Sequence, residues 1–208
     1  MARRNLRNLD ERILKRTIHY GAVDGAGNIS TKRIAKDLRV TEPTIYVHFK
    51  TKENLLLSAF VYCIQDIYDE EYIKKATIAE NAEHLDEELL RLLQKGKDNS
   101  EEIVYAFNYR HSVYYAPTES EESKTYLDLF HKLVRAYVND PDMTEKTTAT
   151  LVNVCLEIVD LFIYKAAKGE IEPNPVTAKI LSALVLGGLA NGKKYFYDFL
   201  TDEEKASL

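Results

Sequence analysis

TEPTIYVHFKTKE, residues 41–53, decides the fold of this chain. Thr41 can cap a helix, and Pro43 is tolerated in the first helical turn because its missing N–H would have no partner there. The stretch predicts a very short helix, followed at once by another helix that Thr51 can cap. Hydroxyl, aromatic and imidazole groups share one face of the short helix, and such a face suits a DNA groove better than a catalytic pocket.

The residues before this stretch predict another helix that meets the short one at a steep angle. Ser30 is a good N-cap. The apolar positions of the helix that it begins are Ile34, Ala35 and Leu38. Only Arg39 and Val40 separate Leu38 from Thr41, which is too few residues for a relaxed loop. This is the spacing of a helix-turn-helix.

The pattern of apolar residues is helical along almost the whole chain. Apolar residues recur at three- and four-residue spacing, without sustained two-residue alternation between hairpin turns. The sequence therefore predicts an all-α fold whose first helix runs from about Asp10 to Tyr20 and is ended by nearby glycines. Beyond the helix that follows Thr51, further helices are expected at about residues 81–96, 101–115, 121–139, 143–168 and 176–200.

Charge divides the chain into a basic N-terminal part and an acidic remainder. Residues 1–52 contain 12 Lys+Arg and 5 Asp+Glu, a balance of +7, whereas residues 53–208 carry −12. Nucleic-acid affinity needs only a local cluster of cations, and a protein with a net charge of −5 can have one. The basic part therefore favours a polyanionic partner over an ordinary solvated surface.

Other classes of protein find little support in the sequence. The N-terminal residues lack the apolar stretch of a secretory signal, and the longest apolar run, Ala183–Ala190, is too short to span a bilayer. We therefore expect a cytoplasmic protein without a membrane partner. Cys63 and Cys155 lie in apolar helical patterns and are expected to be buried thiols. The absence of phosphate-loop, metal-ligand and nucleophile motifs predicts no cofactor, no metal and no catalytic residue.

Two stretches of the sequence carry a family resemblance. They are ISTKRIA, residues 29–35, and EPTIYVHFKTKENL, residues 42–55. They resemble the second helix, the third helix and the start of the fourth in the TetR (tetracycline repressor) family of transcriptional regulators. The resemblance implies an N-terminal helix-turn-helix DNA-binding domain, residues 6–66, and a C-terminal helical domain for effector binding and dimerisation, residues 67–208.

The resemblance also implies which residues contact double-stranded DNA. The residues at the amino end of the third helix that approach base edges in the major groove are Glu42, Pro43 and Thr44. Thr41, the N-cap of this helix, is also expected to contact DNA. The residues expected to hold the phosphate backbone or to flank the groove are Thr31, Lys32, Tyr46, His48 and Lys52. These roles are physically reasonable, because helix N-termini present unpaired N–H groups to phosphates and short hydroxyl side chains reach bases without blocking the groove.

Several of these positions have more than one interpretation. Phe49 is expected to pack in the core of the three-helix subdomain, whereas Tyr46 is expected at the surface. His48 is either a phosphate contact or an ordinary solvated or core histidine. Glu42 either accepts a hydrogen bond from a cytosine amino group or stabilises the helix N-terminus. Arg39 stands where the family commonly has glycine, so we expect a positive φ there at a cost of about 1 kcal/mol.

An aromatic-rich helix in the C-terminal part is the candidate effector site. The residues expected to line a small-molecule pocket are Tyr105, Tyr109, Arg110 and Tyr114. The alternative is that these aromatic side chains fill the core. If a ligand binds, we expect it to change the spacing between the two DNA-binding domains of a dimer by shifting the helix that begins at Thr51.

The last two predicted helices indicate self-association. Residues 180–190 are apolar almost all the way round, and an equally broad apolar band runs over residues 151–163. A helix of this kind must be covered on opposite sides. We therefore predict a homodimer with a two-fold four-helix interface formed by residues 143–168 and 176–200. The alternative is a helix buried within one subunit.

Together these patterns predict a DNA-binding transcriptional regulator. The resemblance further implies a ligand-responsive repressor that binds a palindromic operator as a homodimer and is released by a small-molecule effector. The alternatives are a helical adaptor, or a small enzyme that uses the aromatic pocket, neither of which would bind DNA specifically.

Overall fold

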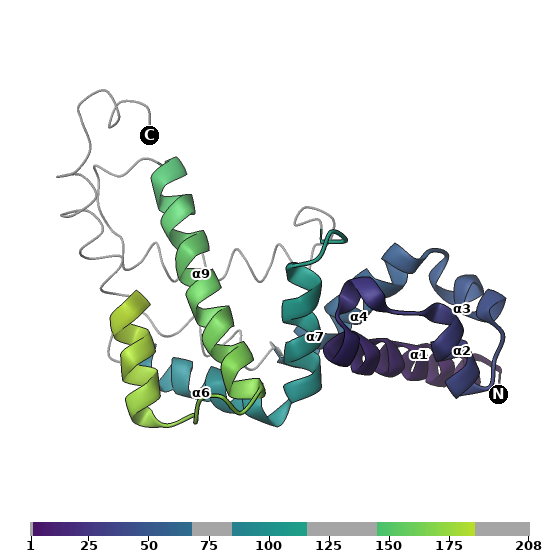
Figure 1. Cartoon of the computed structure of the whole chain (residues 1–208), viewed down its shortest axis with the longest axis horizontal. Helices are drawn as coiled ribbons and strands as arrows, with labels where there is room; N and C mark the ends of the chain where they lie inside the picture. Colours follow the sequence, from purple (N-terminus) through teal and green to yellow (C-terminus); the bar gives the residue numbers. More distant parts are fainter. Residues whose placement is uncertain (1, 68–84, 116–144, 186–208) are drawn as a thin grey trace. The chain divides into compact units, whose positions relative to one another are not determined.

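The computed structural model describes residues 2–67, 85–115 and 145–185, and these residues form helices joined by turns, with no strand among them (Figure 1). The elements are α1 (Ala2–Asp24), the 3-10 turn η1 (Ala26–Asn28), α2 (Thr31–Leu38), α3 (Glu42–Phe49), α4 (Lys52–Ile67), α6 (Leu85–Asp98), α7 (Ser100–Arg110), α9 (Glu145–Ala167) and a helical stretch at 175–185. The predicted all-α fold is confirmed. The helix predicted at 121–139 and the end of the one predicted at 176–200 lie outside the described residues.

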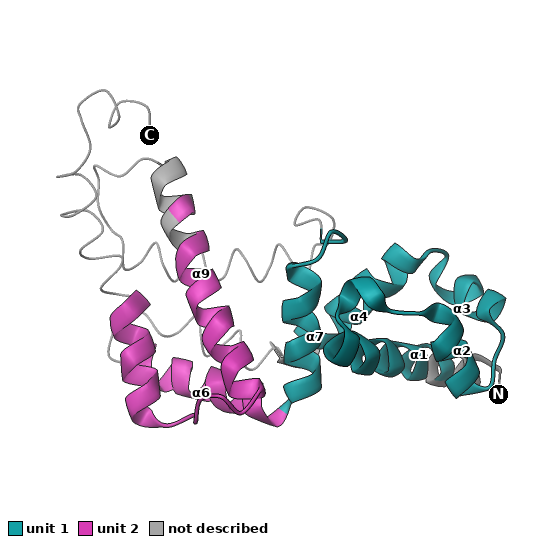
Figure 2. Cartoon of the chain, in the orientation of Figure 1, with its two compact units in different colours: residues 1–67, 99–123 teal, residues 68–98, 124–208 magenta. Residues whose placement is uncertain are grey.

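The chain forms two compact units (Figure 2). Unit 1 contains residues 1–67 and 99–123, and unit 2 contains residues 68–98 and 124–208. This division differs from the predicted boundary between residues 66 and 67, because α7 packs against α1 and α4 within unit 1.

The first helix is longer than predicted at both ends. The predicted end at Tyr20 is too early, because Gly21 lies inside α1 and serves close packing. A Cβ added to Gly21 would lie only 2.3 Å from Cδ2 of Tyr105 on α7. The helix ends at Asp24, before Gly25, which has a φ of 84° that favours glycine.

Unit 1 has an aliphatic core shared by its first four helices. The fully buried side chains on these helices include Ile13, Ile18, Ile34, Ile45, Leu55 and Leu56. Each such side chain contributes about 1.5–3 kcal/mol through its removal from water. The positions predicted to form the inner face of α2, Ile34, Ala35 and Leu38, are all buried. The helix-turn-helix is therefore fixed by packing on its inner side.

Three polar contacts fasten α7 to the other helices of unit 1. The Tyr105 hydroxyl donates a hydrogen bond to the Leu56 carbonyl of α4 at 2.7 Å. Burial raises the pKa of Tyr105 well above its ordinary value, so the phenol remains a neutral donor. Asn108 donates from Nδ2 to the Gly21 carbonyl of α1 at 3.0 Å, and His19 Nδ1 lies 2.9 Å from Glu101 Oε1.

Unit 2 packs α6 against α9. Its buried apolar side chains include Leu89, Leu92, Leu93, Leu156, Val159, Ile163, Leu181 and Val185. Gly96 allows the two helices to approach closely, since a Cβ at this position would lie 2.8 Å from Cγ2 of Ile163. An ion pair of 2.6 Å between Lys97 Nζ and Glu172 Oε1 joins the end of α6 to the residues that follow α9.

Both cysteines are buried free thiols, as predicted. Burial raises the pKa of the Cys155 thiol, which keeps it protonated and weakly reactive. Within the described ranges, no cluster of His, Cys, Asp and Glu side chains is able to hold a metal ion. No described helix is both long enough and apolar enough to cross a lipid bilayer.

Candidate DNA-binding surface

The turn between α2 and α3 sets the angle of the helix-turn-helix. Arg39 has φ 58° and ψ 41°, which is the left-handed conformation expected from the sequence. Its N–H donates to the Lys36 carbonyl at 3.2 Å, and the Val40 N–H donates to the Ala35 carbonyl at 3.0 Å. These two bonds form a Schellman motif, which satisfies the last carbonyls of α2 and reverses the chain in two residues.

The N-terminal end of α3 is open to solvent. Thr41 precedes the helix, and its hydroxyl lies 2.8 Å from that of Thr44. Pro43 is exposed in the first turn, whereas Phe49 is buried, as predicted. Val47 is 81% exposed on the same helix, and sequence reasoning did not include it among the contact residues. An exposed apolar side chain here can contact a thymine methyl group in the major groove.

A hydrogen-bond cluster joins the start of α2 to α3. The Thr31 hydroxyl donates to the Glu42 carboxylate and lies 3.2 Å from the Tyr46 hydroxyl. Thr31 is only 6% exposed, so its side chain lies beneath the surface that it was expected to help form. The structure therefore places Thr31 where it orients Glu42 and Tyr46, both of which are partly exposed.

His48 is attached to α1. Its Nδ1 contacts the Asp10 carboxylate, and its side chain is 11% exposed. This nitrogen faces the protein. The contact explains part of the local packing, because it ties the end of α3 to the first helix.

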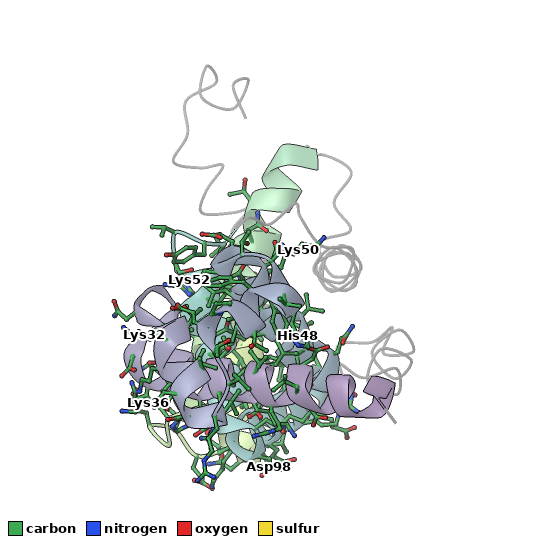
Figure 3. All side chains as sticks on the ribbon, turned by 90° about the vertical axis from the view of Figure 1, so that its right-hand side faces the viewer. Lys32, Lys36, His48, Lys50, Lys52 and Asp98 are labelled. Atoms are coloured by element: carbon green, nitrogen blue, oxygen red, sulfur yellow. The ribbon has the colours of Figure 1, made fainter. Side chains whose placement is uncertain are left out.

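Lysines surround the exposed parts of α2 and α3. Figure 3 shows Lys32 and Lys36 of α2, Lys50 after α3 and Lys52 at the start of α4 on the side of unit 1 that faces the viewer, together with His48. Lys32, Lys36 and Lys50 are exposed, and Lys52 is half-buried. Because phosphate contacts account for much of DNA affinity, this arrangement provides the cations that a groove-binding helix needs on its flanks.

The junction between α3 and α4 is a strained turn centred on Lys50. Lys50 has φ 63° and ψ −56°, and the Thr51 N–H donates to the Phe49 carbonyl at 2.7 Å, which makes a γ-turn of the rare positive-φ kind. Thr51 then caps α4 by accepting the Asn54 N–H at 3.1 Å, as predicted. Lys50 was missed as a contact residue, although its charge directly after the reading helix was a usable signal.

Residues 13–59 match the family model described as bacterial regulatory proteins, tetR family. The matched residues contain the whole helix-turn-helix described above. The N-terminal helices match the tetR family model. This match confirms the predicted resemblance to the TetR family of transcriptional regulators.

Two solved structures resemble this chain over most of its length. One is a TetR family transcription regulator from Marinobacter aquaeolei VT8, with a TM-score of 0.64, 18% identity, and coverage of 91% of this chain and 98% of the other. The second is a TetR-like transcriptional regulator from Rhodococcus sp. RHA1, with a TM-score of 0.59, 19% identity, and coverage of 86% and 94%. At these identities the likeness concerns the fold. No curated protein matches the chain significantly.

The aromatic residues predicted as an effector site lie beside the helices that match the family model. Tyr105 and Tyr109 are buried, with ring centroids 6.3 Å apart, and Tyr109 also lies 5.0 Å from Phe60 of α4. This packing is what the core-filling alternative expects. Arg110 and Tyr114 are half-buried at the end of α7 and just beyond it.

A cavity of about 360 Å³ lies elsewhere in unit 1. Its lining residues are Arg12, Lys15, Arg16, His19, Asp37, Leu38 and Glu101. None of the four residues predicted for the effector pocket belongs to this set. The carboxylates of Asp37 and Glu101 offset part of the positive charge of α1 here, and Lys15 is paired with Glu11 at 2.7 Å.

Proposed function

We propose that the chain is a cytoplasmic, ligand-responsive repressor that binds a palindromic operator as a homodimer. The observation that carries this proposal is the solvent-exposed start of α3, held at a fixed angle by the Arg39 turn and flanked by lysines. A short helix presented in this way enters the major groove with its first residues on base edges. Thr44 and Val47 then read bases, while Lys32, Lys50 and Lys52 hold phosphates.

The described part of unit 2 supports self-association. Five large apolar side chains are about half exposed or more, and their spacing is helical: Val154, Leu161, Val176, Ile180 and Leu184. The first two are seven residues apart on α9, and the other three recur every four residues in the stretch at 175–185. Each set forms one stripe, and burial against a second copy would remove these stripes from water. They lie within the ranges predicted for the interface.

We also propose that a small molecule releases the protein from DNA through α7. This helix is fastened both to α1 and to α4, whose first residue is Lys52. If α7 has one position in the DNA-binding state and another in the non-binding state, a ligand that binds the second position better shifts the equilibrium toward the non-binding state. The buried positions of Tyr105 and Tyr109 suit a role in transmitting such a shift.

The direct test is a gel-shift titration with DNA taken from upstream of the protein's own gene. The proposal expects salt-sensitive binding that unlabelled specific DNA competes for better than random DNA. Thr44→Ala and Val47→Ala are expected to weaken binding to the specific fragment while leaving binding to random DNA nearly unchanged. No complex at low salt would reject the proposal and favour a helical adaptor.

A further inference from the structure

The ammonium group of Lys52 has two partners inside unit 1. Its Nζ donates a hydrogen bond to the Gly27 carbonyl at 3.3 Å, and it lies 5.3 Å from the centroid of the Tyr114 ring. A cation at this distance from an aromatic face is attracted by the ring. Lys52 begins α4, Gly27 belongs to η1 and Tyr114 follows α7, so three elements meet at one lysine.

Tyr114 is itself held in place from the core. Its carbonyl accepts a hydrogen bond from the Tyr109 hydroxyl at 3.2 Å, and its N–H donates to Ser112 Oγ at 3.3 Å. The Ser112 hydroxyl in turn donates to the Tyr109 carbonyl at 2.7 Å. Since Tyr109 is packed against Phe60, the short segment that carries Tyr114 is anchored to α4 as well as to α7.

We propose that Tyr114 is a positioning residue for Lys52 and thereby strengthens DNA binding. This inference rests on the proposed DNA-binding function. A free lysine side chain loses rotational freedom when it contacts a phosphate, and this loss weakens binding. The Tyr114 ring and the Gly27 carbonyl restrict Lys52 before DNA arrives, and the remaining ammonium protons stay available for a phosphate oxygen. The solvent-exposed Lys32 and Lys50 differ from the half-buried Lys52 in this respect.

The inference can be tested without knowing the operator, because a phosphate contact contributes to binding of any sequence. The probe is a fluorescent 30-base-pair duplex of fixed mixed sequence, titrated with the full chain at several KCl concentrations. The variants are Tyr114→Leu, Tyr114→Phe, Lys52→Met and the double variant Tyr114→Leu/Lys52→Met. Val113→Ala is the matched control, since Val113 is the preceding residue and is 96% exposed.

Tyr114→Leu is expected to weaken binding about two- to fivefold, the size of an exposed cation–π contact. Tyr114→Phe retains an aromatic face and is expected to bind like the wild type, as is the Val113→Ala control. In the Lys52→Met background, Tyr114→Leu is expected to have no further effect. Lys52→Met is expected to reduce the magnitude of the slope of log affinity against log salt by about one.

A second measurement distinguishes the loss of the contact between Tyr114 and Lys52 from a folding defect in Tyr114→Leu. In the DNA-free protein, the NMR signal of the Lys52 ε-methylene group is expected to be shifted upfield by the ring in the wild type and in Tyr114→Phe, but not in Tyr114→Leu. The inference would be overturned if Tyr114→Leu weakened DNA binding equally in the wild-type and Lys52→Met backgrounds. It would also be overturned if Tyr114→Phe weakened DNA binding as much as Tyr114→Leu. A wild-type protein that binds no duplex at low salt would instead overturn the DNA-binding function and this inference with it.

Discussion

Two non-glycine residues with positive φ lie at the two ends of α3, the helix proposed to contact DNA bases. Arg39 precedes α3 in the left-handed region, and Lys50 follows it in a γ-turn. The sequence predicted the first, because only two residues separate the helices and the family commonly has glycine there. It did not predict the second, because nothing in the order Phe49-Lys50-Thr51 marks a γ-turn.

Glycine at either position is expected to stabilise the protein. At Arg39 the relief of about 1 kcal/mol is offset by roughly 0.5 kcal/mol from a more flexible unfolded chain, which leaves a gain near 0.5 kcal/mol. At Lys50 the strain is larger, of order 1–3 kcal/mol, so Lys50→Gly is expected to gain more. Urea unfolding measures both free energies. Lys36→Gly, in a helix interior, is the control and is expected to lose about 1 kcal/mol; a loss for all three variants would contradict the backbone argument.

Thr31 is expected to act on stability as well as on DNA binding. Thr31→Val keeps the shape of the side chain but removes the donor to Glu42, at a cost of about 1 kcal/mol in the free energy of unfolding. Thr31→Ser keeps the hydroxyl and is expected to retain most of the stability. Thermal unfolding of the two variants makes the comparison. If Thr31→Val were as stable as the wild type, the hydrogen bonds of Thr31 with Glu42 and Tyr46 would contribute nothing to the free energy of unfolding.

At the scale of elements, the helices whose ends are marked by local residues were predicted well. Ser30 and Thr51 cap the helices that follow them, and α2 and α4 begin directly after these residues, as expected. The first helix was predicted poorly, because Gly21 serves a contact with α7 that is more than eighty residues away in the sequence. Periodicity could not show that α7 packs within unit 1, since that depends on which apolar faces meet.

Gly21→Ala is expected to destabilise the protein although alanine favours helices. The added methyl group would overlap the Tyr105 ring, and overpacking of this kind costs about 1–3 kcal/mol, more than the gain in helix propensity of about 1 kcal/mol. Gly27→Ala is the matched control, because a Cβ there meets nothing within 4 Å. Chemical unfolding of both variants checks the packing. Similar stability for both would show that α7 does not approach α1 as described.

At the scale of the whole molecule, the family resemblance located the candidate site, while the roles of single residues needed coordinates. The sequence could not reveal that Thr31 lies beneath the surface, that His48 turns toward Asp10, or that Val47 is exposed. It also left open whether the aromatic residues of α7 line a pocket or fill the core. Those outcomes depend on contacts between elements that are distant in sequence.

Self-association is expected to depend on the apolar stripes of unit 2. Ile180→Glu places a charge in the proposed interface, where an unpaired charge is costly to bury. The variant is therefore expected to sediment as a monomer at concentrations at which the wild type is a dimer. Lys179→Glu changes the charge of the neighbouring exposed residue and is the control. A wild-type monomer, or an Ile180→Glu variant that remains dimeric, would count against the stripes as the interface.

The central claim is that a pair of exposed α3 helices reads DNA. Hydroxyl-radical footprinting on DNA from upstream of the protein's own gene tests it most directly. The account predicts two symmetric protected half-sites whose centres are separated by whole helical turns of about 10 base pairs, and it predicts that Thr44→Ala/Val47→Ala abolishes this protection. The absence of protection at low salt, or a single protected patch that the double variant leaves unchanged, would contradict the account.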